Sequence, residues 1–350
     1  IDSKIKKVDS VEVHGIYPDL KILNELSLGF NITEVVHASK QKTDNSNSLR
    51  PIFLVAERDS EKLLICCVTP GRDLLVHYAS MIKYYLRNIP IRVNVYAYPL
   101  AEKSISKWTG LDDKMIIKND IVILGYSTFF KSRLEKDSDF SVLSAYQNKF
   151  YSATRFISKN GRVVNCLEAN YGHWGDISDF LAQKICQLNA AEILHIGKVG
   201  TLKSPSEVYS RIYIPKSFVV GRRNEIMSLG SKISNSMEYI KEHSSLAHVS
   251  VSTTMEETFT QRESFSKNKI DTIDIESSKI ARAVALYNLT NKTKVRFGAI
   301  HFSSDYLKKF REPNQSLEMD LSTNREDLKY RKQNILNDIF YIIKKHIIEK

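Results

Sequence analysis

Strand-like and helix-like runs alternate along most of this chain, and this alternation limits the folds that it can adopt. From residue 121 onward, short apolar runs at 121–125 and 163–168 are followed by amphipathic runs such as 177–188 and 277–289. Strands separated by helices of this length form a sheet with helices packed on its faces. We therefore expect an α/β fold with three αβα layers around a mixed sheet.

A shorter α/β pattern precedes this region. Strand-like runs occur at 11–17, 32–38, 52–56, 63–68 and 91–98, with one helix-like run at 73–86. The turn-forming residues 110–113 close this pattern. The sequence thus predicts a small α/β domain of unknown role over 1–112 and a larger domain over 113–350. In the larger domain we expect a helix near 225–242 and an amphipathic helix over 325–348 that docks on the sheet.

The composition is typical of a soluble globular protein. The 350 residues are 42% hydrophobic and 26% charged, which suits one large domain or two ordinary ones. No apolar run approaches the roughly 20 residues that span a bilayer, so we expect no membrane partner. We expect a cytoplasmic protein because its cysteines look reduced and no leader is visible. Cys66, Cys67, Cys166 and Cys186 form no C-x-x-C pair, and buried reduced thiols are expected rather than a metal site or disulfides.

The chain carries a formal net charge of +11. Lysines spread over solvated faces account for such an excess. A nucleic-acid partner is the alternative, and it would show steeply salt-dependent binding. We do not expect that partner, because no basic run has the interleaved aromatic residues of a nucleic-acid groove.

Two acidic residues stand where strand-like runs end. Glu276 belongs to the run Ile273-Asp274-Ile275-Glu276-Ser277, and Asp305 closes His301-Phe302-Ser303-Ser304-Asp305. Open α/β sheets gather ligand-binding groups at the carboxyl ends of their strands. The pattern predicts that both carboxylates face one pocket, one near sugar hydroxyls and the other near a heterocyclic base. The structural alternatives are a helix N-terminal acid for Glu276 and a cap for Asp305.

Four segments resemble motifs of the nucleoside phosphorylase and nucleosidase superfamily, over about residues 115–350. They are Asn170-Tyr171-Gly172-His173-Trp174-Gly175, similar to a "GHGxG" loop; Ile196 to Leu202 (IGKVGTL), similar to a "vGsxGal" loop; Ile273 to Ser277, similar to "vxMEt"; and Ser304-Asp305, similar to "SD". The resemblance implies a phosphorylase-like domain that cleaves the N-glycosidic bond of a purine nucleoside or nucleotide. Phosphate or water would attack through an oxocarbenium-like transition state. It also implies a homo-oligomer that needs no cofactor, with phosphate as the possible co-substrate.

The resemblance assigns roles to individual residues. Glu276 would bind the ribose hydroxyls, and Asp305 would meet the departing base as an acid, for which its pKa must be raised. The remaining substrate-binding residues would be Gly197, Lys198, Val199, Gly200, Phe259 as a base-stacking ring, Ile275 under the sugar, and His173 near its 5′ end.

The chain departs from the family at the phosphate site. Its first strand in this region ends Gly125-Tyr126-Ser127-Thr128 instead of "GDPxR", and His195 stands where a phosphate-binding arginine is common. The possible anion-binding residues are Lys198, His195 and Arg133. Neutral histidine is a poor replacement for a bidentate guanidinium. A nucleosidase, an enzyme acting on a nucleotide, and a non-catalytic nucleoside- or nucleotide-sensing module therefore all remain open.

Overall fold

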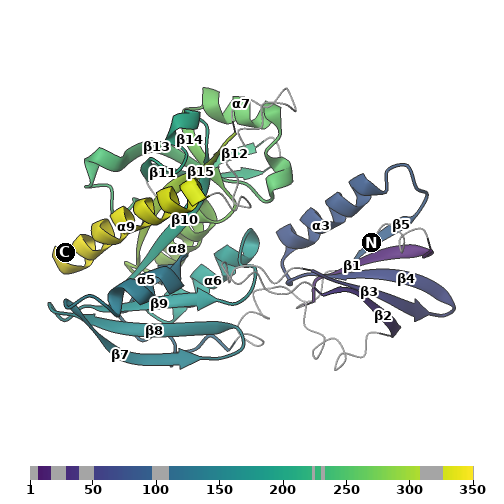
Figure 1. Ribbon diagram of the computed structural model, residues 1–350, viewed down its shortest axis with the longest axis horizontal. Coiled ribbons are helices and arrows are strands. Elements are labelled where there is room, and N and C mark those ends of the chain that lie inside the picture. Colours follow the sequence, from purple (N-terminus) through teal and green to yellow (C-terminus); the bar gives the residue numbers. More distant parts are fainter. Residues whose placement is uncertain are drawn as a thin grey trace. The chain divides into compact units, whose positions relative to one another are not determined.

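The computed structural model describes residues 7–16, 29–38, 51–96, 110–222, 225–229, 233–307 and 326–349, and its elements are labelled in Figure 1. By its contacts the chain divides into two compact units. The first contains residues 1–109 together with 169–177, and the second contains residues 110–168 and 178–350. The sequence places one boundary at 112/113 and assigns 169–177 to the larger domain.

The first unit is a small α/β sheet with strand order β2-β3-β4-β1-β5. The central strand β1 runs parallel to both β4 and β5, whereas β2, β3 and β4 form an antiparallel meander. The strands are β1 Ser10–His14, β2 Asn31–Ala38, β3 Ile52–Arg58, β4 Glu61–Cys67 and β5 Arg92–Tyr96, with one helix, α3 Arg72–Tyr85. These elements lie at the predicted runs. The runs could be recognised because their apolar residues fill the core beside β1 and β4.

The glycine-rich motif at 170–175 packs within the first unit. Next to it, the Asp176 carboxylate accepts hydrogen bonds from the backbone N–H groups of Arg72 (2.9 Å) and Asp73 (3.2 Å). Those N–H groups are at the start of α3, where they have no partner within the helix. The Trp174 ring meets the ring of His77 edge-on, with centroids 5.1 Å apart. The motif and the acid that follows it thus hold the beginning of α3.

The second unit is built on one large mixed sheet. Within the described residues its order is β12-β11-β13-β14-β10-β6-β9-β8-β7, and β15 pairs with β10 and β11. The strands are β6 Ile121–Leu124, β7 Phe140–Gln147, β8 Tyr151–Ser158, β9 Val163–Ala169, β10 Glu192–Thr201, β11 Ile212–Arg222, β12 Glu225–Ser228, β13 Ser244–Ser250, β14 Ile270–Asp274 and β15 Arg296–Tyr306. The helices are α5 Ser127–Leu134, α6 Asp176–Gln187, α7 Phe259–Lys267, α8 Ser277–Asn291 and α9 Glu326–Glu349. The predicted α/β fold with a mixed sheet is confirmed.

One predicted element of this unit is wrong. The helix expected near 225–242 is replaced by β12, which pairs antiparallel with β11, and by the 3₁₀ turn η3 Lys241–His243. In addition, α5, α7 and the hairpin of β7 and β8 were not predicted. The glycine segment 197–200, expected as a loop, lies inside β10. The helix was predicted wrongly because β12 is a short strand at the edge of the sheet. Such a strand can lack the alternation of apolar and polar residues that marks a strand in the sequence.

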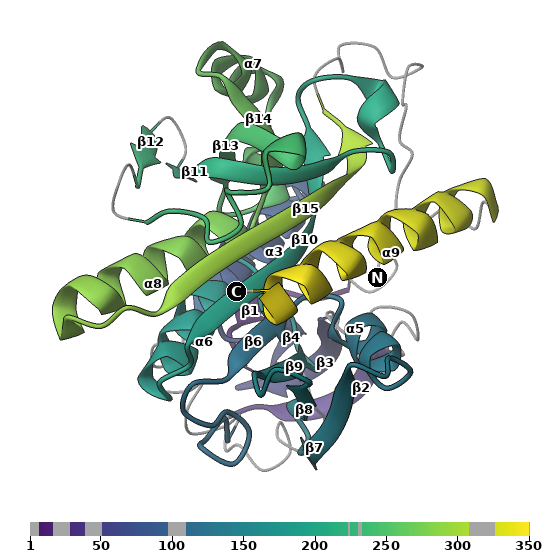
Figure 2. The same ribbon diagram turned by 90° about the vertical axis from the view of Figure 1, so that its left-hand side faces the viewer.

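Helix α9 docks on the sheet as predicted. Its buried residues Ile335, Ile339 and Ile343 share one core with Ile196 of β10 and Phe302 of β15. Figure 2 shows α9 crossing beside these two strands. None of the helices within the described ranges is both long and apolar enough to cross a membrane.

A buried ion pair ties α9 to the first residue of β10. Glu192 and His346 are both fully buried, and His346 Nε2 lies 3.1 Å and 3.2 Å from the two carboxylate oxygens of Glu192. Arg296 donates to the same carboxylate at 2.7 Å, and Ser236 donates to it as well. Burial alone raises the pKa of Glu192, but these partners outweigh it and leave the pKa lowered.

Replacing His346 with alanine should lower the free energy of unfolding by about 2–4 kcal/mol, because it leaves a cavity beside a buried carboxylate that has lost a partner. Chemical denaturation measures this change. Lys345→Ala is the matched control, since Lys345 is the exposed neighbour on the same helix, and it should cost less than about 0.5 kcal/mol. Equal stabilities of the two variants would contradict the role of this pair.

Candidate functional site

Some of the predicted site residues lie near the last residues of β10. Gly200 pairs with Ile273 of β14 and with Asp305 of β15, and the β10–β15 register shifts between Val199 and Gly200. Glu276 follows β14 by two residues, at the N-cap position of α8. The carboxyl end of β14 and Asp305 therefore flank the same strand.

Glu276 and Lys198 are both partly exposed, and the charge of Lys198 acts on the Glu276 carboxyl group. Burial, followed by the negative charge of Asp274, raises the pKa of Glu276 to about 8; the Ile275 N–H and the ammonium groups of Lys279 and Lys198 oppose that rise. The structure thus brings together two residues that the sequence predicted for one pocket. Without a ligand, however, Glu276 is mostly protonated at neutral pH, and not the fixed negative charge that the resemblance implies.

Asp305 lies in β15, one residue before the strand ends at Tyr306. Its side chain is partly exposed and accepts a hydrogen bond from the Ser304 hydroxyl. A Cβ atom on Gly200 would stand 3.1 Å from Asp305 Oδ2 and 2.2 Å from Leu307 Cδ1. A side chain at position 200 would therefore press on the Leu307 side chain, which follows β15, and on the Asp305 carboxylate.

Glu257 is a further acidic residue of this region, and the sequence did not single it out. It follows the 3₁₀ turn η4 Thr254–Glu256, two residues before Phe259 opens α7. Burial raises the pKa of Glu257 to about 8, and the charges of Asp305 and Asp274 add to that effect against Arg262. No local pattern marks this residue, because its pKa depends on neighbours from distant parts of the chain.

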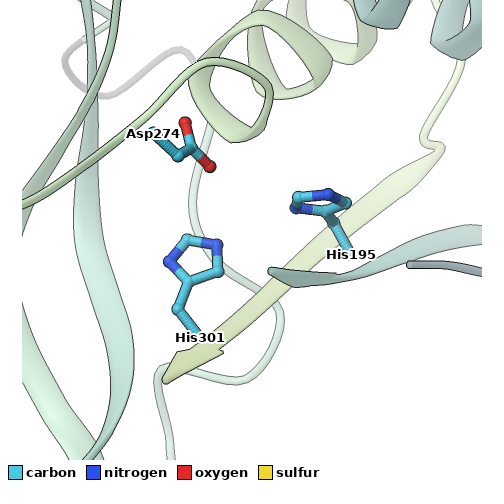
Figure 3. A group of neighbouring side chains, drawn as sticks. All are labelled: His195, Asp274 and His301. Atoms are coloured by element: carbon cyan, nitrogen blue, oxygen red, sulfur yellow. The ribbon is translucent and has the colours of Figure 1, made fainter. Parts of the chain in front are cut away.

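Beneath these groups lies a buried polar network centred on Ser277. The Ser277 hydroxyl is 2.9 Å from His195 Nδ1 and 2.9 Å from His301 Nε2, and it donates to Asp274 Oδ2. His248 Nε2 is 2.8 Å from Asp274 Oδ1. Figure 3 shows His195, Asp274 and His301 facing a common centre. All five residues are less than a tenth exposed.

Asp274 is the acceptor at the middle of this network. Burial raises its pKa, but His248, through its charge and its hydrogen bond, together with His301 and His195, holds the pKa of Asp274 well below its ordinary value. Burial and the charge of His248 lower the pKa of His301 well below its usual range. The network therefore fixes an ionised carboxylate under the first turn of α8.

The other predicted residues are distributed as follows. His195 points into the buried network, and the Arg133 guanidinium lies over the Phe340 ring at 5.2 Å. Of the three possible anion-binding residues, Lys198 is the one whose charge acts on Glu276. His173 is buried within the first unit, where burial lowers its pKa.

The backbone residues predicted to contact substrate lie in β10. Val199 is buried, and Gly197 lies against two imidazoles, because a Cβ there would be 3.1 Å from both His195 Cε1 and His301 Cδ2. Ile275 is partly buried and packs against the core that contains Ile273 and Leu202. Gly197 thus serves the buried network instead of a loop around a ligand.

No family model matches the chain. Among curated proteins it is similar to "Oxidoreductase cns1" of Cordyceps militaris, with 25% identity over 314 residues. That match covers 82% of this chain and 38% of the relative. The chain therefore spans about two fifths of the relative's length.

Solved structures that are similar to this chain include nucleoside phosphorylases. Schistosoma mansoni purine nucleoside phosphorylase with inosine matches 71% of this chain and 96% of its own, with a TM-score of 0.48 and 12% identity. The Toxoplasma gondii purine nucleoside phosphorylase in complex with immucillin-H matches 66% and 92%, with a TM-score of 0.44 and 14% identity. Vibrio fischeri uridine phosphorylase matches 68% and 95%, with a TM-score of 0.45 and 13% identity. At these values, the function of the chain has to be inferred from its own residues.

The raised pKa of Glu257 predicts a pH-dependent loss of stability. The folded carboxyl keeps its proton up to about pH 8, whereas the unfolded one ionises near pH 4.3. Folding is therefore favoured at low pH, and stability falls as the pH rises through this window. Glu257→Gln should reduce that fall by about 1 kcal/mol or more, measured by denaturation at pH 5 and pH 8.5.

Glu263→Gln is the control, because Glu263 is exposed on the same helix that follows Glu257. It should keep the wild-type pH dependence. A Glu257→Gln profile parallel to that of the wild type would show that Glu257 is not held in a proton-retaining environment.

Proposed function

We propose that the second unit binds a purine nucleoside or nucleotide at the end of β10 and cleaves its N-glycosidic bond. The observation that carries this proposal is the pairing of Gly200 with both Ile273 and Asp305. It sets Asp305 on one side of β10 and the strand leading to Glu276 on the other. A ligand bound at Gly200 would have the Asp305 carboxyl group on one side and the Glu276 carboxyl group on the other.

Each carboxyl group has a distinct part in this chemistry. Glu276 accepts hydrogen bonds from the sugar hydroxyls, and its ionisation is favoured when positive charge develops on the ribosyl ring. Asp305, aligned by Ser304, meets the base. Glu257 carries a proton at neutral pH because its pKa is raised to about 8, so it is the nearby source of a proton for the departing base.

The proposed nucleophile is water. The substrate is either a nucleoside or a nucleotide that carries its own phosphate. Lys198 supplies one positive charge beside Glu276, and His195 is committed to Ser277. A free phosphate co-substrate usually needs bidentate donors such as arginine. This favours a nucleosidase or an enzyme acting on a nucleotide over a phosphorylase. No cofactor is proposed, and the protein is proposed to act as a homo-oligomer.

A non-catalytic nucleoside- or nucleotide-binding module is the second candidate. The commitment of His195 to the buried network favours it, since a degraded anion site is compatible with binding alone. Oxidoreduction, named for the Cordyceps relative, has no such support here. The chain contains no G-x-G-x-x-G run, the fingerprint of a Rossmann dinucleotide site.

Base release from purine nucleosides and nucleotides, with and without phosphate, tests the proposal. The wild type should release base without added phosphate. Glu276→Gln and Asp305→Asn should each lower turnover more than tenfold, because each removes a group that contacts the reacting molecule. Glu263→Gln, an exposed acid on α7, should keep the wild-type rate.

The same panel separates the two candidate functions. Thermal stabilisation by a nucleoside without any base release would identify the non-catalytic module. Wild-type rates in both carboxylate variants would overturn the assigned roles.

A further inference from the structure

Three potential metal-ligand atoms surround one point in the core of the second unit. His195 Nδ1, Asp274 Oδ2 and His301 Nε2 each hydrogen-bond the Ser277 hydroxyl. One ligand atom from each of these three residues lies within 4.8 Å of the other two. The residues come from β10, β14 and β15, which are adjacent strands (Figure 3).

The two imidazole nitrogens and the carboxylate oxygen are a set of ligand atoms that suits a zinc ion. Two imidazole nitrogens and one carboxylate oxygen are common Zn²⁺ ligands, at about 2.0–2.2 Å from the metal. The two nitrogens are each 2.9 Å from the Ser277 oxygen, so an inward movement of less than about 1 Å per ligand would reach those distances. Rotation of the Ser277 side chain would vacate the centre.

The surroundings hold the carboxylate in the orientation that a ligand needs. Asp274 Oδ1 receives hydrogen bonds from the Glu276 N–H at 3.0 Å and from the Ser250 hydroxyl, and His248 Nε2 is 2.8 Å away. Oδ2 is directed at the centre, where it accepts hydrogen bonds from the Ser277 hydroxyl and from the Ser277 N–H at 3.1 Å. Outer partners of this kind fix ligand orientation in metal sites and are part of their design.

The two imidazoles also have room to approach each other. Gly197 lies against both rings, and any side chain there would press on His195 and His301 at 3.1 Å. Burying a carboxylate is costly unless it is paired. His248 pairs with Asp274 from the Oδ1 side, and a divalent cation at the centre would pair with it from the Oδ2 side and link the three strands.

We infer that His195, Asp274 and His301 bind a Zn²⁺ ion in the core of the second unit, with the Ser277 hydroxyl displaced from its centre. None of these three residues is assigned a part in the proposed glycosidic cleavage, so zinc binding can be tested apart from that activity. The ion adds stability because the folded chain binds it and the unfolded chain lacks the assembled site.

Metal analysis of the full chain tests this inference. After dialysis against a chelator, the protein should bind one Zn²⁺ per chain on titration, and its Tm should rise. The double variant His195→Asn/His301→Gln places an amide nitrogen near each lost ring nitrogen, so it can still donate to Ser277 but is a poor zinc ligand. It should bind Zn²⁺ at least about 100-fold more weakly.

Two further variants separate a metal site from a hydrogen-bonded network. Ser277→Ala removes the group at the centre, so it should keep stoichiometric zinc. His243→Asn, a partly exposed histidine of η3 outside the cluster, should bind zinc like the wild type. The inference is overturned if the wild type binds no stoichiometric zinc, or if the double variant binds zinc as tightly as the wild type.

Discussion

The parallel pairing of β10 with β15 is the constraint on which the candidate site depends. The two strands pair from Glu192 with Arg296 to Thr201 with Tyr306, with one shift at Val199 and Gly200. That shift sets Asp305 opposite Gly200, a position where a larger residue would press on the side chains of Asp305 and Leu307. Moving the register by one residue would turn Asp305 to the other face of the sheet.

The buried Asp274 links this strand pair to the start of α8. It accepts hydrogen bonds from the N–H groups of Glu276 and Ser277, so it satisfies donors that the first turn of a helix leaves free. Its negative charge is also one cause of the raised pKa of Glu276. The core network and the partly exposed carboxyl groups are therefore electrostatically coupled.

Much of the fold could be predicted from periodicity. The strands β6, β9, β10 and β14 and the helices α6, α8 and α9 have strong apolar patterns, because many of their apolar residues are buried. The hairpin of β7 and β8 was missed, since β7 is exposed along nearly its whole length and includes exposed Val142 and Leu143. Residues 225–242 were misassigned because Ile226, Met227 and Leu229 fit a helical spacing as well as an edge strand.

The site was only partly predictable for a different reason. Glu276, Asp305 and Lys198 could be found because they lie in motifs that follow or end strands. Glu257 and the network of His248, Asp274 and His301 could not be found from the sequence. Their shifted pKa values and hydrogen bonds depend on burial and on neighbours that are distant along the chain. The motif containing His173 was assigned to the substrate pocket from local sequence, whereas contacts with α3 hold it in the first unit.

The most direct measurement of the central claim is a crystal structure of the protein with a purine nucleoside bound. We predict the sugar hydroxyls within hydrogen-bonding distance of Glu276 and the base beside Asp305, with the ligand lying over Gly200. A nucleoside bound elsewhere in the second unit, or one that contacts neither carboxyl group, would contradict this account.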